Sequence, residues 1–160
     1  MFVKQDIVLL HGVTSSGKTE IYNYLITETI KNKKQVLFLL PEIALTTQII
    51  DRLKRIYGNY MGVYHSRFNE SERIEVWNNI AFHEHIEQKE FHKIMLVVGA
   101  RSSIFLPFNN LGLVIIDEEH DGSYKQNDQN PRYNARDAAI YLAYLHKSKV
   151  LLGSATPSIE

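Results

Sequence analysis

The chain contains no cysteine among its 160 residues. This absence excludes disulfide bonds and thiolate zinc sites within these residues, and it suits a reducing compartment. The charge is balanced, with 18 basic and 18 acidic side chains, so the chain lacks the basic excess of a domain that holds nucleic acid alone. It also lacks a secretory signal and any apolar run long enough to span a membrane, and we therefore expect a cytoplasmic location.

Apolar segments typical of strands alternate along the chain with segments of helical spacing. We expect strands at Ile7–Leu10, Val36–Leu40, Val63–His65, Ile94–Val98, Leu113–Ile116 and Val150–Leu152. We expect helices over Ile21–Ile30, Glu42–Tyr57, a segment capped by Asn69 or Ser71, and Ala135–His146. The length favours one domain. The alternation predicts an α/β fold, a mostly parallel sheet with helices on both faces.

The first candidate site is a phosphate-binding loop, which fits the pattern G-x-x-x-x-G-K-[ST] at every fixed position. A strand precedes it and a helix follows, so backbone N–H groups and the helix N-terminus can surround phosphates. Lys18 would reach the β and γ phosphates, and the Thr19 hydroxyl would bind Mg²⁺. The alternative is a chance match in a turn. The predicted nucleotide-binding residues are Gly12, Val13, Thr14, Ser15, Ser16, Gly17, Lys18 and Thr19.

Two further motifs follow later strands. Asp117 and Glu118 come directly after an apolar strand, at the end where open α/β sheets bind ligands. Asp117 is predicted to hold Mg²⁺, and Glu118 to orient or deprotonate an attacking water. Ser154 and Thr156 follow the last strand. Each segment alone could be an ordinary turn, but beside a phosphate loop they favour ATP hydrolysis.

These three motifs, in this order, resemble those of superfamily 2 helicases. Further segments narrow the resemblance to the primosomal protein N′ family of bacterial replication-restart helicases. They are His11–Thr14, Leu40–Thr46, Val98–Ser103, Tyr124–Gln126, Pro131–Tyr133 and Ala135–Asp137. The resemblance extends from Ile7 to Ile159 and implies a RecA-like P-loop NTPase domain. Residues 1–160 would then be one motor lobe, the ATP-binding lobe 1, of a larger protein.

The family resemblance implies an ATP-driven 3′ to 5′ DNA helicase that uses Mg²⁺ and acts at stalled forks in primosome assembly. Its implied partners are forked or single-stranded DNA, primosome proteins and single-stranded-DNA-binding protein, at the nucleoid. Lys18, Asp117 and Glu118 would be catalytic. Residues that would contact DNA or couple it to hydrolysis are His120, Ser154, Thr156, Arg101, Tyr124, Lys125, Arg132, Tyr133 and Arg136.

The segments Pro41–Thr46 and Gly99–Ser103 would lie along the single strand. In the loop Asp121–Arg136, the resemblance implies an aromatic-rich segment that senses DNA. There Tyr124 and Tyr133 could stack on bases, while Lys125, Arg132 and Arg136 could meet phosphates. The alternative is a surface loop whose tyrosines pack locally.

The chain departs from the family pattern in two places. Ser15 stands where glycine is usual, and we expect nucleotide binding to survive because the fixed glycines remain. Asn134 stands where histidine is usual and is a suitable helix cap.

The family also has a DNA-binding region before the phosphate loop, and a second lobe with an arginine finger and cysteine-bound zinc. We therefore expect a fragment without zinc that hydrolyses ATP very poorly by itself. Two other functions remain open at this point: a small P-loop kinase, and a nucleotide-binding or protein-docking module without turnover.

Overall fold

A six-stranded parallel sheet forms the centre of the computed structural model, which describes residues 5–13, 16–41, 47–65, 69–81, 93–127 and 130–157. The strand order is β1-β8-β5-β2-β4-β3, and every neighbouring pair is parallel. The strands are β1 (Ile7–His11), β2 (Gln35–Leu39), β3 (Met61–Tyr64), β4 (Leu96–Gly99), β5 (Leu111–Ile116) and β8 (Lys149–Ser154). The predicted α/β class is therefore confirmed.

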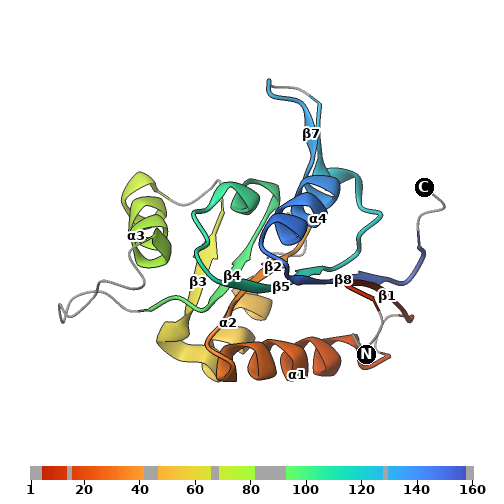
Figure 1. The fold of residues 1–160 in the computed structure, drawn as a ribbon, viewed down its shortest axis with the longest axis horizontal. Coiled ribbons are helices and arrows are strands. Elements are labelled where there is room, and N and C mark those ends of the chain that lie inside the picture. The colour runs from red at the N-terminus through yellow and green to blue at the C-terminus, as the bar shows by residue number, and fades with distance from the viewer. Residues whose placement is uncertain are drawn as a thin grey trace.

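Helices cover both faces of this sheet (Figure 1). One face carries α1 (Lys18–Lys31) and α2 (Thr47–Tyr57), and the other carries α4 (Ala135–Leu145). The short helix η2 (Arg101–Phe105) and α3 (Glu70–Ala81) contribute to the α4 side. Within the described ranges, no helix combines the length and the apolar character needed to cross a bilayer.

The central strands are buried on both sides, and each contributes to two apolar clusters. In β5, Ile115 points into the cluster with α1 and α2, and Ile116 into the cluster with α4. This alternation explains why these strands read as continuous apolar runs. The edge strand β1 differs, because Ile7 and Leu9 remain 44% and 48% exposed.

Two of the predicted helices, α2 and α3, are present, and Asn69 is the one of its two predicted caps that α3 uses. The predicted helix Glu42–Tyr57 is described only from Thr47, since residues 42–46 lie outside the described ranges. In α3, Asn69 provides the cap, accepting from the Glu72 N–H at 2.9 Å while its own N–H donates to the Glu72 carboxylate at 3.2 Å. This reciprocal pair is a capping box.

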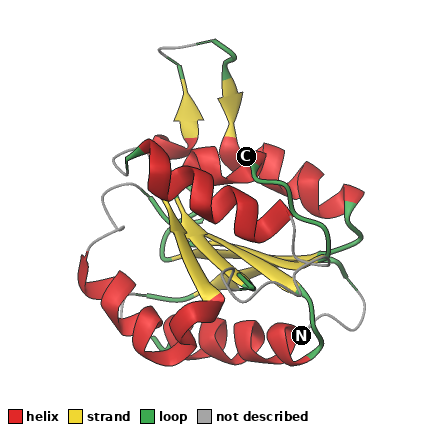
Figure 2. Ribbon diagram, turned by 90° about the vertical axis from the view of Figure 1, so that its left-hand side faces the viewer, coloured by secondary structure: helices red, strands yellow, loops and turns green. Residues whose placement is uncertain are grey.

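The segment predicted as a loop between Asp121 and Arg136 contains regular structure. The short helix η3 (Gly122–Tyr124) leads into β6 (Lys125–Gln126), which pairs antiparallel with β7 (Tyr133–Asn134). Figures 1 and 2 show this hairpin projecting away from the sheet beside α4. The loop prediction failed because strands this short show no alternating pattern.

Candidate functional site

The three sequence motifs meet at the carboxyl edge of the sheet. The Gly12 N–H donates to the Ser154 carbonyl at 3.1 Å, which joins the phosphate loop to the end of β8. The acidic segment is held between its neighbours, because the Asp117 N–H donates to the Leu39 carbonyl and the Glu119 N–H to that of Gly153, each at 3.0 Å. Parallel pairing thus converts motifs that are distant in sequence into one site.

The phosphate loop ends in a left-handed residue. Gly17 has a φ of 84°, which glycine adopts at little cost, and α1 begins at the next residue, Lys18. The Lys18 side chain is 10% exposed. Thr14 and Ser15 lie outside the described residues; the structure describes the other predicted members, Gly12, Val13, Ser16, Gly17, Lys18 and Thr19.

Glu118 links the phosphate loop to the third motif. Its Oε1 accepts a hydrogen bond from Lys18 Nζ at 3.0 Å, and its Oε2 lies 3.5 Å from the Ala155 N–H and 3.8 Å from His120 Nδ1. The backbone of Glu118 is left-handed, with a φ of 45°. A non-glycine residue in this region is strained, and such residues gather at functional sites.

Asp117 is held by a residue that the sequence reasoning missed as a site residue. The Tyr22 hydroxyl donates to Asp117 Oδ1 at 2.8 Å. Burial raises the pKa of the Asp117 carboxyl, and the hydrogen bond from Tyr22 opposes that rise. The available signal was spacing, because Tyr22 follows Lys18 by four residues and so lies on the same face of α1.

A hydroxyl–imidazole cluster joins the acidic segment to β8. His120 Nδ1 lies 2.8 Å from Ser154 Oγ, and its Nε2 lies 3.2 Å from Thr156 Oγ1. The Thr156 N–H donates to Ser154 Oγ at 3.1 Å. The structure therefore brings together all three of these predicted coupling residues, 2.8 to 3.2 Å apart.

The structure contradicts one predicted contact with DNA. Tyr124 is 1% exposed, so its ring is packed in the protein core and does not offer a face to a base. Its hydroxyl donates to the Asp117 carbonyl at 2.6 Å and to the Leu39 carbonyl at 3.2 Å. The sequence shows an aromatic ring at this position but not the two backbone acceptors at the strand ends.

Arg136 and Arg101 are engaged within the protein. Arg136 Nη1 donates to Glu119 Oε2 at 3.0 Å, and its Nε donates to Asp137 Oδ1 at 2.9 Å. The hydrogen bond to Asp137 and that to Glu119 both raise the pKa of the Arg136 guanidinium. Arg101 Nη1 donates to the carbonyls of Ser123 and Lys125, at 3.3 and 3.4 Å. Phosphate contact by Arg136 would compete with two carboxylates, which the sequence could not show.

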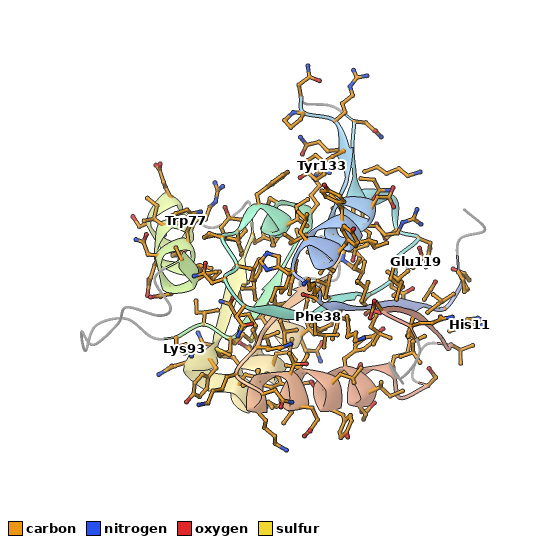
Figure 3. The ribbon with its side chains drawn as sticks, in the orientation of Figure 1. His11, Phe38, Trp77, Lys93, Glu119 and Tyr133 are labelled. Atoms are coloured by element: carbon orange, nitrogen blue, oxygen red, sulfur yellow. The ribbon has the colours of Figure 1, made fainter. Side chains whose placement is uncertain are left out.

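The hairpin also presents exposed groups. Lys125 and Arg132 are exposed, and Tyr133 is half-buried. Figure 3 shows Tyr133 at the base of the hairpin, above α4. Its ring meets Phe105 edge to face, with centroids 5.2 Å apart, and Phe105 is 63% exposed. This aromatic pair joins η2 to the hairpin, and Phe105 was not predicted as a site residue.

The donor set fits a magnesium nucleotide. A left-handed glycine, a lysine and a threonine stand at the start of a long helix, where N–H groups and the helix dipole favour phosphate. The carboxylates of Asp117 and Glu118 lie at the same sheet edge, and carboxylate oxygen is the ligand that Mg²⁺ prefers. The residues that would hold the metal are Thr19 and Asp117.

Comparison with known proteins agrees with this arrangement. A family model described as DEAD/DEAH box helicase matches residues 2–160. The chain is 46% identical over 157 residues to the replication restart protein PriA of Helicobacter pylori, covering 98% of this chain and 24% of that protein. It is 47% identical over 157 residues to PriA of Bacillus subtilis, covering 98% of this chain and 18% of that protein.

A solved structure supports the fold. The structure of RecG bound to a three-way DNA junction superposes with a TM-score of 0.61 at 24% sequence identity, over 93% of this chain and 18% of that one. The chain thus spans about a fifth of the length of the relatives it matches. The predicted family resemblance and the RecA-like fold are confirmed, and the chain belongs to the DEAD/DEAH box helicase family.

Proposed function

We propose that the chain is the ATP-binding motor lobe of a 3′ to 5′ DNA helicase that acts at stalled replication forks. The observation that carries this proposal is the ion pair between Lys18 and Glu118, at 3.0 Å, beside Asp117. It joins a phosphate-loop lysine to an acidic segment at the edge where α/β sheets bind ligands. Replication restart and primosome assembly, and primosome and single-strand-binding proteins as partners, follow from the similarity to PriA proteins.

Each residue has a defined task in ATP hydrolysis. The N–H groups around Gly17 bind phosphate oxygens, and Lys18 leaves Glu118 to meet the β and γ phosphates. Thr19 and Asp117 would hold Mg²⁺, which would neutralise charge on the phosphates. The Glu118 carboxylate, once released from Lys18, is available to orient or deprotonate water. The resting ion pair thus keeps the base occupied until a nucleotide arrives.

The hairpin supplies a connection between DNA and this site. Before its first strand, the Tyr124 hydroxyl donates a hydrogen bond to the Asp117 carbonyl. After its second strand, Arg136 donates a hydrogen bond to the Glu119 carboxylate. A DNA strand bound to the exposed Lys125 or Arg132 would displace the hairpin. That displacement would reach the acidic segment through Tyr124 at Asp117 and through Arg136 at Glu119. Tyr133 and Phe105 offer aromatic surface for stacking. We therefore assign Tyr124 and Arg136 to coupling rather than to direct contact with DNA.

Calorimetric titration with a non-hydrolysable ATP analogue and Mg²⁺ tests the nucleotide site. The unmodified chain should bind, and Lys18→Ala should weaken binding by at least about tenfold, since an ion pair with phosphate is lost. The matched control is Lys31→Ala, because Lys31 lies on the same helix but pairs with Glu28 on its exposed surface. If the unmodified chain bound no nucleotide, the proposal would fail and a docking module would be favoured.

A further inference from the structure

Tyr22 places a hydroxyl donor at the proposed magnesium carboxylate. It lies one turn after Lys18 in α1, is 2% exposed, and its hydroxyl donates to Asp117 Oδ1 at 2.8 Å. The ring is fixed edge-on against Phe38, with centroids 5.5 Å apart. One helix therefore carries both the lysine for the phosphates and a rigid donor to the acidic segment.

The Tyr22 hydroxyl occupies space that is free because residue 153 is a glycine. A Cβ at this position would collide with the Tyr22 hydroxyl and lie 3.0 Å from both Tyr22 Cζ and Asp117 Oδ1. Because Gly153 lies in β8 just before Ser154, the strand leading to the third motif has no side chain where the tyrosine reaches the carboxylate. The contact thus depends on three separate elements.

A buried tyrosine hydroxyl needs a partner, so the contact with Asp117 could serve stability alone. Tyr57 shows what such a role looks like in the same cluster. Its hydroxyl donates to the Asn23 carbonyl at 3.2 Å and lies 3.5 Å from Thr27 Oγ1, and both partners are uncharged groups on α1. Tyr22 instead donates to an ionisable group, which burial would otherwise leave poorly solvated.

We infer that Tyr22 is a positioning residue, whose hydroxyl fixes the plane of the Asp117 carboxylate for magnesium bound with nucleotide. The inference rests on the proposed function. Partners behind a metal ligand orient it and maintain its affinity for the metal, and their loss typically costs about 10- to 100-fold. Tyr22 acts through Asp117 and has no other task in this proposal.

The first test compares nucleotide affinity with and without magnesium. In Tyr22→Phe, affinity for the non-hydrolysable ATP analogue should fall about tenfold with Mg²⁺ present, while affinity in EDTA stays unchanged. Tyr57→Phe, which removes a comparable hydroxyl from the same helix interface, should leave both affinities unchanged. Equal magnesium dependence in Tyr22→Phe and the unmodified chain would overturn the inference. No magnesium effect in the unmodified chain would instead refute the proposed function.

The second test needs no nucleotide. Gly153→Ala should lower the urea midpoint strongly in the unmodified chain and less in the Tyr22→Phe background, because the colliding hydroxyl is gone. A double-mutant cycle measures this non-additivity. If Gly153→Ala alone does not fold, folding of the double variant is the expected rescue. Additive losses would show that the hydroxyl does not occupy this space and would overturn the inference.

Discussion

In the proposed mechanism, Glu118 loses its ion pair with Lys18 when a nucleotide binds. Its left-handed backbone turns a carboxylate toward Lys18, and its second oxygen faces Ala155. The ion pair is partly buried, with the Lys18 side chain 10% exposed and that of Glu118 34% exposed. A nucleotide must therefore displace a protein carboxylate from the lysine before phosphate can take its place.

Glu118→Gln should consequently bind the nucleotide more tightly while losing turnover. Removal of the competing charge is expected to raise affinity for the ATP analogue about twofold to fivefold, the range of a partly exposed ion pair. Calorimetric titration measures the affinity. The control is Glu20→Gln, because Glu20 is an exposed acid in the first turn of α1, the helix that carries Lys18. Equal gains in both variants would indicate a general charge effect and no competition at Lys18.

At this scale the sequence predicted the principal groups but not their partners. The motifs around Gly17, Lys18 and Asp117 predicted ligand residues from residue type and spacing. The parallel pairing of the strands places these residues at one edge of the sheet. The base-stacking role predicted for Tyr124 is wrong, and Tyr22 was not predicted as a site residue. Whether a tyrosine faces solvent or a buried carboxylate depends on tertiary packing, which short motifs do not encode.

Among the elements, the hairpin and α4 form one unit attached to the acidic segment. Asn134 ends β7 and caps α4, since its Oδ1 accepts from the Arg136 N–H at 3.0 Å. The next turn of α4 inserts Ala135 and Ala139 into the core. The cap thus fixes where the hairpin joins the helix.

Asn134→Ala should lower the free energy of unfolding by about 1 kcal/mol, the usual cost of a lost N-cap. Urea denaturation measures it. Asn134→Ser retains a capping oxygen and should recover most of the loss. A recovery no better than that of alanine would mean that the capping bond contributes little.

Tyr124→Phe keeps the buried ring and removes the donor to the Leu39 and Asp117 carbonyls. We expect the free energy of unfolding to fall by about 1 to 3 kcal/mol, because buried acceptors lose a partner. Chemical denaturation again measures the change. Tyr141→Phe, on an exposed ring, should stay within about 0.5 kcal/mol of the unmodified chain. A similar small effect at both positions would contradict the anchoring role of Tyr124.

The long elements were predictable and the short ones were not. The buried run in β5 and the helical spacing of α1 gave the correct type because both are strongly periodic or continuous. The boundaries moved by up to three residues: α1 begins at Lys18 and not Ile21, and β4 begins at Leu96 and not Ile94. In α3, Ile74 and Trp77 are 52% and 43% exposed despite their apolar spacing, so this helix packs chiefly through Ile80.

At the scale of the whole molecule, the proposed function makes these residues one side of a motor. They include a lysine, carboxylates and a hydroxyl cluster, but the family resemblance assigns the arginine finger to a second lobe. We expect turnover by this chain to be about 10³- to 10⁵-fold below that of a full-length relative, the usual contribution of such an arginine. Phosphate release, with and without single-stranded DNA, measures it.

The appropriate background for that assay is Lys18→Ala, which should release phosphate no faster than buffer. DNA-stimulated turnover equal to that of the Bacillus subtilis relative would contradict the assignment, because it would place every essential group within these residues. Turnover that appears only when the rest of a full-length relative is supplied in trans would support it.

The position of β1 at the edge of the sheet has a dynamic consequence. Among the described strands it has β8 as its single neighbour, and two of its side chains remain about half exposed. Amide hydrogens in such a strand exchange through small local openings, well below the free energy of global unfolding. We therefore expect the phosphate loop to follow a strand that opens more readily than the central strands. A bound nucleotide stabilises the conformation that binds it, and it would therefore reduce local opening of β1 and of the phosphate loop.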